Sequence, residues 1–138
     1  MIETVQFRPE HLWTLTPQPE QRAELEAARE ANLEGDGWSV RKDEKTLACA
    51  ILTELGDGRA AVWAFIGADA GPHMTKVFRV ADRMFDMSAY RRIEATVLAG
   101  FQAGVRWMRM LHFELETPNG MKKFGPHGET YLLYARVR

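Results

Sequence analysis

The chain has 138 residues, 46% of them hydrophobic and 27% charged, which is enough for one globular domain that needs no metal or disulfide to stabilise it. Cys49 is the only cysteine, so an internal disulfide is excluded and a cysteine-based zinc site is not expected. The formal net charge of -1 argues against a protein built mainly to bind nucleic acid.

The charge is distributed unevenly along the chain. Residues 1–69 contain 7 Lys and Arg against 13 Asp and Glu, and residues 70–138 contain 11 against 6, so the halves carry -6 and +5. A basic half could meet an anionic partner such as a phosphorylated cofactor or nucleic acid. Halves that interleave in space would instead neutralise each other, and both interpretations stay open.

The first third is expected to form one strand and two helical segments. Residues 2–8 alternate loosely between apolar and polar side chains and end at Pro9, which predicts a short strand. A short helical piece is expected at residues 10–15. A longer helix is predicted at residues 20–33, between Pro19 and Gly35. The N-terminus lacks the apolar region of a signal peptide, and the single cysteine suits a reducing compartment, so we expect a cytoplasmic protein.

The middle of the chain reads as a meander of strands. Residues 38–41, 46–55 and 59–66 are strand-like, with a charged turn at residues 42–45 and the hairpin signal Asp57-Gly58 between them. The longest mainly apolar run, residues 47–52, is far too short to span a bilayer. We therefore expect no membrane partner.

The second half alternates helices and strands. An apolar stripe predicts a helix at residues 73–87, carried by Val77, Val80, Ala81, Met84 and Phe85. Residues 91–97 form an alternating strand, residues 101–111 a second helix, and residues 113–116 and 130–137 two further strands. The order β-α-α-β-β-β-α-β-α-β-β predicts an α/β (α+β) fold. It is one domain over residues 1–138, with a mixed, mostly antiparallel sheet of about seven strands and helices on both faces.

Two segments resemble motifs of the GNAT superfamily of N-acetyltransferases. They are Phe65-Ile66-Gly67-Ala68-Asp69-Ala70-Gly71-Pro72-His73-Met74 and Gly104-Val105-Arg106-Trp107-Met108-Arg109-Met110-Leu111-His112-Phe113-Glu114. The resemblance implies a single GNAT-like domain with acetyl-CoA as cofactor and no metal. In such enzymes the first segment holds the cofactor pyrophosphate on backbone amides and a helix N-terminus. The implied cofactor-binding positions are Gly67, Gly71, His73, Met74, Thr75, Lys76 and Arg79.

The chain more narrowly resembles small GNAT-like proteins of tailed phages and prophages, which include internal virion or core-like proteins of short-tailed phages. Four segments within residues 60–138 carry this resemblance: Asp69 to Met74, Tyr90 to Val97, Arg106 to Phe113, and Gly125 to Val137. It implies a role in virion assembly or as a minor virion component, with other phage structural proteins as partners. The protein would then be cytoplasmic in the bacterial host and virion-associated.

The sequence departs from the pattern of an active GNAT enzyme at two places. The expected Arg/Gln-x-x-Gly-x-Gly/Ala motif is missing, Pro72 removes one amide donor, and Asp69 adds a negative charge where an anion should sit. Many GNAT enzymes use a Tyr in the fourth helix as general acid. Aligning His112-Phe113 on the family's Gly-Phe pair puts Met108 there, and Met cannot donate a proton.

Several side chains admit a functional and a structural interpretation. Glu94, on a central strand, is the candidate general base if burial raises its pKa, or else the partner of a nearby Arg. Lys76, Arg79 and Arg83 could receive a phosphate, or form a solvated helix face. The bulky side chains Trp63, Trp107, Phe85, Phe101 and Met110 are expected in the core.

Two functions from different classes follow. The first is a catalytically degenerate GNAT-fold protein acting in virion assembly, and the alternative is an acetyl-CoA-dependent N-acetyltransferase acting on an amine. The four histidines lack metal-ligand spacing, so no metal site is expected. We do not expect nucleic acid as a partner, because the basic residues lack interleaved exposed aromatic side chains.

Overall fold

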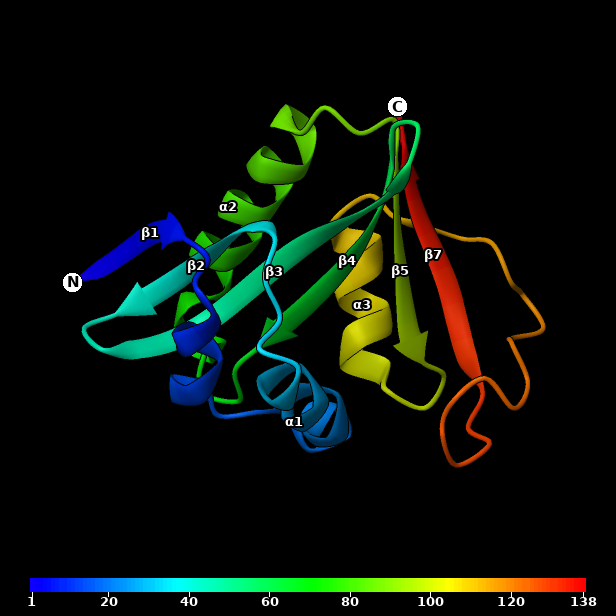
Figure 1. Cartoon of the computed structure of the whole chain (residues 1–138), viewed down its shortest axis with the longest axis horizontal. Coiled ribbons are helices and arrows are strands. Elements are labelled where there is room, and N and C mark those ends of the chain that lie inside the picture. The colour runs from blue at the N-terminus through cyan, green and yellow to red at the C-terminus, as the bar shows by residue number, and fades with distance from the viewer. The chain divides into compact units, whose positions relative to one another are not determined.

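The computed structural model describes all 138 residues and contains seven strands, three α-helices and three short 3-10 helices (Figure 1). In chain order they are β1 Ile2–Gln6, η1 Pro9–Thr14, η2 Pro19–Gln21, α1 Arg22–Glu30, β2 Asp36–Lys42, β3 Lys45–Gly56, β4 Arg59–Ile66, η3 Gly71–His73, α2 Met74–Met87, β5 Arg92–Leu98, α3 Gln102–Met110, β6 Glu114–Leu115 and β7 Tyr131–Val137.

The strands follow the order β1-β2-β3-β4-β5-β7-β6 in one sheet. The pairs β1–β2, β2–β3, β5–β7 and β6–β7 are antiparallel, and β4 pairs with β5 in parallel. The predicted mixed, mostly antiparallel sheet of seven strands is therefore confirmed. The chain divides into two compact units, Met1–Thr53 with Val62–Met87, and Glu54–Ala61 with Ser88–Arg138.

The first unit has helices on both faces of its strands. Ser39 Oγ contacts His11 Nδ1 of η1 at 2.8 Å, whereas the ring of the preceding residue, Trp38, meets Phe85 of α2 with centroids 5.1 Å apart. Successive strand side chains point to opposite faces, so η1 and α2 cover opposite sides, and α2 runs behind β2 and β3 in Figure 1. The core on the η1 and α1 side consists of Phe7, Leu12, Leu15, Leu25, Ala28, Cys49, Ile51 and Phe65.

Two helices of this unit end or begin differently from the prediction. α1 ends at Glu30 rather than Leu33, because Asn32 adopts a left-handed φ of 49° and closes the helix. The Asn32 amide donates to Arg29 O, and the Leu33 amide donates to Ala28 O. This is the hydrogen-bond pattern of a Schellman cap. The segment predicted at residues 10–15 is the 3-10 helix Pro9–Thr14, and Leu15 after it is extended.

The second unit packs α3 against β5. Ile93, Ala95 and Val97 are buried on one face of β5, as the alternation predicted. A Cβ on Gly104 of α3 would lie 2.7 Å from the Phe101 ring and 2.9 Å from Val97 Cγ1. Only glycine therefore allows this close approach of helix and strand.

Two expected core residues are on the surface. Trp63 is 38% exposed and Met110 is 53% exposed, whereas Phe85 and Phe101 are buried as predicted. An apolar side chain on a helix or strand stays in contact with water wherever no other element covers it. The prediction for Trp63 and Met110 was wrong for this reason.

Candidate functional site

The loop between β4 and α2 contains the predicted phosphate-binding positions, and protein carbonyls take up most of its backbone amides. The amides of Gly67, Ala68, Ala70 and His73 donate to Leu47 O, Thr16 O, Gly67 O and Ala70 O at 2.7 to 3.1 Å. The Met74 amide donates to Gly71 O, and Pro72 has no N–H. The 3-10 turn of Gly71–His73 thus satisfies amides that an anion would otherwise need.

The Asp69 side chain folds back over the same loop. Its Oδ1 lies 2.8 Å from the position of a Cβ built on Gly67, and its Oδ2 lies 3.1 Å from Lys45 Nζ. Both side chains are partly exposed, Lys45 at 44% and Asp69 at 40%. The carboxylate is therefore held at the loop by an ion pair that solvent can reach.

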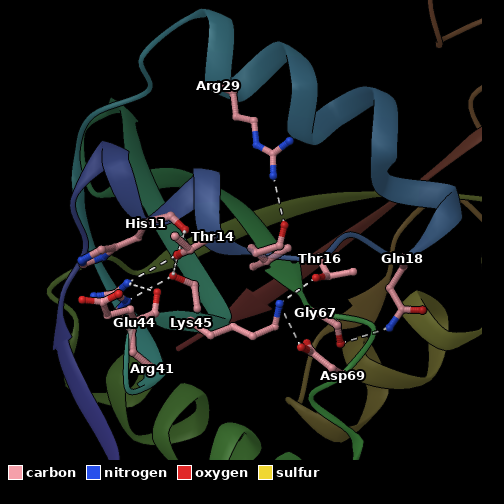
Figure 2. A network of polar contacts seen from close by, with 12 residues as sticks. His11, Thr14, Thr16, Gln18, Arg29, Arg41, Glu44, Lys45, Gly67 and Asp69 are labelled. Carbon is pink, nitrogen blue, oxygen red and sulfur yellow. Dashed lines mark hydrogen bonds and ion pairs between the residues drawn. The ribbon is translucent and has the colours of Figure 1, made fainter.

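A second segment, Thr16 to Gln18, is hydrogen-bonded to this loop (Figure 2). Thr16 O accepts the Ala68 amide at 2.9 Å, and Gln18 Nε2 donates to Gly67 O at 3.4 Å. Lys45 Nζ also donates to Thr16 Oγ1 at 2.8 Å, so it bridges the segment and Asp69. Sequence analysis missed Thr16, Gln18 and Lys45, because nothing in their local pattern shows which loop they contact.

The other predicted cofactor-binding residues lie in the turn Gly71–His73 and the first two turns of α2. Thr75, Lys76 and Arg79 are exposed, and His73 and Met74 are partly buried. Gly71 is exposed, with open space where a Cβ would point. Their grouping follows from the helix period alone, and it gives an exposed, basic start to α2.

Glu94 lies in an ion-pair network of the second unit. Its Oε2 accepts hydrogen bonds from Arg92 Nε at 2.8 Å and Arg59 at 3.2 Å, and Arg92 also binds Glu116. Hydrogen bonding to Arg92 is the main cause that holds the pKa of Glu94 below its ordinary value, against the opposing effect of burial. The side chain is 18% exposed. At neutral pH it is an ionised, doubly paired carboxylate.

α3 ends at a residue with left-handed backbone geometry. His112 adopts a φ of 65°, in the left-handed region where the family has glycine. The Phe113 amide donates to Met108 O and the His112 amide to Arg109 O, which closes the helix. Met108, in the position of the expected general acid, is 6% exposed, so a thioether in the core stands where a phenol would act.

No group of three or more His, Cys, Asp or Glu side chains is arranged to hold a metal ion. None of the helices combines the length and apolar character needed to cross a bilayer. Burial raises the pKa of the Cys49 thiol to about 12, and the residue packs in the core.

Comparison with solved structures identifies the architecture. The chain aligns over 99% of its length with a GNAT-family acetyltransferase from Bacillus anthracis, covering 94% of that chain (TM-score 0.67, 13% identity). It also aligns with a ribosomal-protein-S5-alanine acetyltransferase from Vibrio fischeri (99% and 92% coverage, TM-score 0.65, 14% identity) and an IAA acetyltransferase from Bacillus cereus (100% and 100%, TM-score 0.69, 9% identity). The fold is that of the GNAT acetyltransferases.

The GNAT fold is thus established by structure at very low sequence identity. No protein-family model matches the sequence, and no curated protein sequence matches it either. On this fold, the β4–α2 loop is the segment that the sequence resemblance associates with the cofactor pyrophosphate. In its present conformation the loop does not fit that group, since its amides are bonded internally and a carboxylate lies over it.

Proposed function

We propose that this GNAT-fold protein is a catalytically degenerate protein of phage or prophage type, which acts in virion assembly or as a minor virion component. The phage assignment rests on the sequence resemblance within residues 60–138. The degenerate cofactor loop supports the non-catalytic part.

One observation carries the proposal: most backbone amides of the β4–α2 loop are already bonded to protein carbonyls. A pyrophosphate site relies on several backbone N–H groups pointing at one anion. Here five amides between Gly67 and Met74 donate to protein carbonyls, and Pro72 has no N–H to contribute. Freeing each amide would lose roughly 0.5–1.5 kcal/mol of hydrogen bonding, and Asp69 would repel the incoming phosphates.

The state of Glu94 also supports a non-catalytic protein. A general base must accept a proton near the working pH, which requires a raised carboxyl pKa. Arg92 and Arg59 lower the pKa of Glu94 instead, and both hydrogen-bond the same oxygen. Such a carboxylate is a weaker base than an unpaired one.

An exposed loop offers a surface for partner binding. The connection between β6 and β7 exposes Lys122, Lys123 and Phe124, the last at 55%. Phe124 packs against Tyr131, with ring centroids 5.5 Å apart. Here an exposed aromatic side chain does lie beside basic residues, contrary to the expectation from the sequence. A protein that works through its surface needs such a feature, although a soluble enzyme can also carry one.

Calorimetry with acetyl-CoA and CoA tests the non-catalytic part directly. We expect no binding to the native protein up to millimolar ligand, and micromolar binding would overturn the proposal. The virion part is tested by purifying particles from an induced host and measuring this protein with an antibody. We expect it to copurify with particles or with assembly intermediates, and its absence from both would contradict a virion role.

The alternative is an acetyl-CoA-dependent N-acetyltransferase acting on an amine. The observation that favours it is the structural likeness to several acetyltransferases over the full chain. This activity would require the loop to release its internal hydrogen bonds before the cofactor binds. It is tested by following CoA thiol release from acetyl-CoA with a panel of amines. Release that depends on the amine would establish it.

A further inference from the structure

We propose that Asp69 occupies an anion site of its own protein, formed by Lys45 Nζ, which also donates to Thr16 Oγ1, and that removing this carboxylate opens the site to a phosphate-bearing ligand. The inference rests on the proposed function in one respect: the native loop does not grip a pyrophosphate. It adds a cause, which is that an internal carboxylate takes the place of the ligand.

The contacts show that Asp69 acts as the anion. Lys45 Nζ lies 3.1 Å from Asp69 Oδ2 and 2.8 Å from Thr16 Oγ1. A cationic amine beside a hydroxyl is an arrangement that binds carboxylate and phosphate oxygens alike. The second carboxylate oxygen lies over Gly67, within 2.8 Å of where a Cβ would be, so a side chain at that position would displace it.

Lys45 and its acceptor Thr16 also make contacts that do not involve Asp69. Thr16 is anchored by the hydrogen bond from the Ala68 amide to its carbonyl. Lys45 begins β3, next to Thr46, whose hydroxyl contacts Thr14 Oγ1 at 2.9 Å. Figure 2 shows the Lys45 side chain extended between Thr16 and Asp69. Removal of the carboxylate therefore leaves the contact between Lys45 Nζ and Thr16 Oγ1.

The ion pair is open to competition. Lys45 and Asp69 are 44% and 40% exposed, and exposed pairs of this kind contribute little and are screened by salt. A multiply charged anion interacts more strongly with one ammonium than a single carboxylate does at the same distance. Asp69 nevertheless has the advantage of being tethered a few residues away, which gives it a high effective concentration.

The test is a titration with inorganic pyrophosphate, followed by the amide signals of Gly67 and Ala68 in NMR spectra and by calorimetry at low salt. We expect Asp69→Ala to bind pyrophosphate at least tenfold more tightly than the native protein. The double variant Asp69→Ala with Lys45→Met should return to the native level. Asp43→Ala is the control for net charge, because Asp43 is an exposed acid of the β2–β3 turn whose ion pair is with the N-terminal amine.

Three results would overturn the inference. They are no gain in Asp69→Ala, a gain that survives removal of Lys45, or an equal gain in Asp43→Ala, which would mean that net charge alone is responsible. If Asp69→Ala does not fold, Asp69→Asn keeps the side-chain shape while removing the charge, and the same three results apply. Binding of acetyl-CoA to the native protein would contradict the proposed function, whereas the Asp69 inference fails only on these variants.

Discussion

Replacing Phe65 and Trp63 by Ala, each in its own variant, tests the structure against the sequence prediction. The sequence placed Trp63 in the core, whereas the structure leaves it partly exposed to water. Phe65, near the end of β4, is 1% exposed and packs in the core cluster of the first unit. Trp63 lies two residues earlier on the same face of the strand and is 38% exposed. The two aromatic side chains should therefore differ in their contribution to stability.

The magnitudes follow from burial. Truncating a fully buried Phe to Ala loses about 4 kcal/mol, the middle of the range for such cavities. For a chain of this size, this corresponds to a fall in Tm of about 12 °C. Trp63→Ala should lose roughly 1–2 kcal/mol, since the part of the ring in water stabilises nothing on folding.

Urea unfolding followed by far-UV circular dichroism measures both free energies of unfolding in one experiment. We expect Phe65→Ala to lose at least twice as much as Trp63→Ala, with unchanged dependence on urea concentration. If the two variants lose the same amount, Trp63 is packed as a core residue. The reasoning from burial would then be refuted for this strand.

Three further predictions concern a glycine, an ion-pair network and the thiol. Gly37→Ala would place a Cβ 2.0 Å from Ala50 O, whereas the Cβ of Gly71→Ala meets open space. Chemical denaturation should therefore show that the free energy of unfolding falls by about 3 kcal/mol or more for Gly37→Ala and by under about 0.5 kcal/mol for Gly71→Ala. The pKa values of Glu94 and Glu116 are lowered, chiefly by Arg92, so the stability they contribute is present above their ordinary carboxyl pKa and lost as pH falls through the lowered values. Arg92→Met should then be less stable at pH 7 and lose less on acidification from pH 5 to 3, as urea unfolding at each pH will show; an unchanged slope would contradict this. Burial raises the pKa of Cys49 to about 12, so a thiol reagent at pH 8 should label the native protein only at the rate of unfolding, and rapid labelling without denaturant would contradict the buried position.

Much of the fold could be predicted because its signals are local. The strand at Arg59–Ile66 agrees with the prediction residue for residue, since Asp57-Gly58 and Gly67 mark its ends. The alternation of Ile93, Ala95 and Val97 predicted which face of β5 is buried. Boundaries were less accurate where capping decides them, as at Asn32, because a left-handed residue other than glycine has a weak sequence signal.

The candidate site could be predicted only in part. The sequence located the β4–α2 loop and the loss of one donor at Pro72, because proline and glycine act on their own backbone. It also raised the pairing of Glu94 with an Arg as one of two interpretations, and Arg92 is two residues away. It could not show that Arg59, 35 residues distant, binds the same oxygen.

By itself, the sequence determined the order of strands and helices, the positions of the turns and the residue types in the cofactor loop, since periodicity and backbone preference act within a few neighbouring residues. Only the tertiary structure decided that Trp63 faces water, that the loop amides bind Leu47 and Thr16, and that Lys45 meets Asp69. The loop and ion-pair contacts join residues that are 20 or more positions apart in the sequence. Whether such residues meet, and whether a side chain is covered, depends on how the whole chain packs rather than on any local pattern.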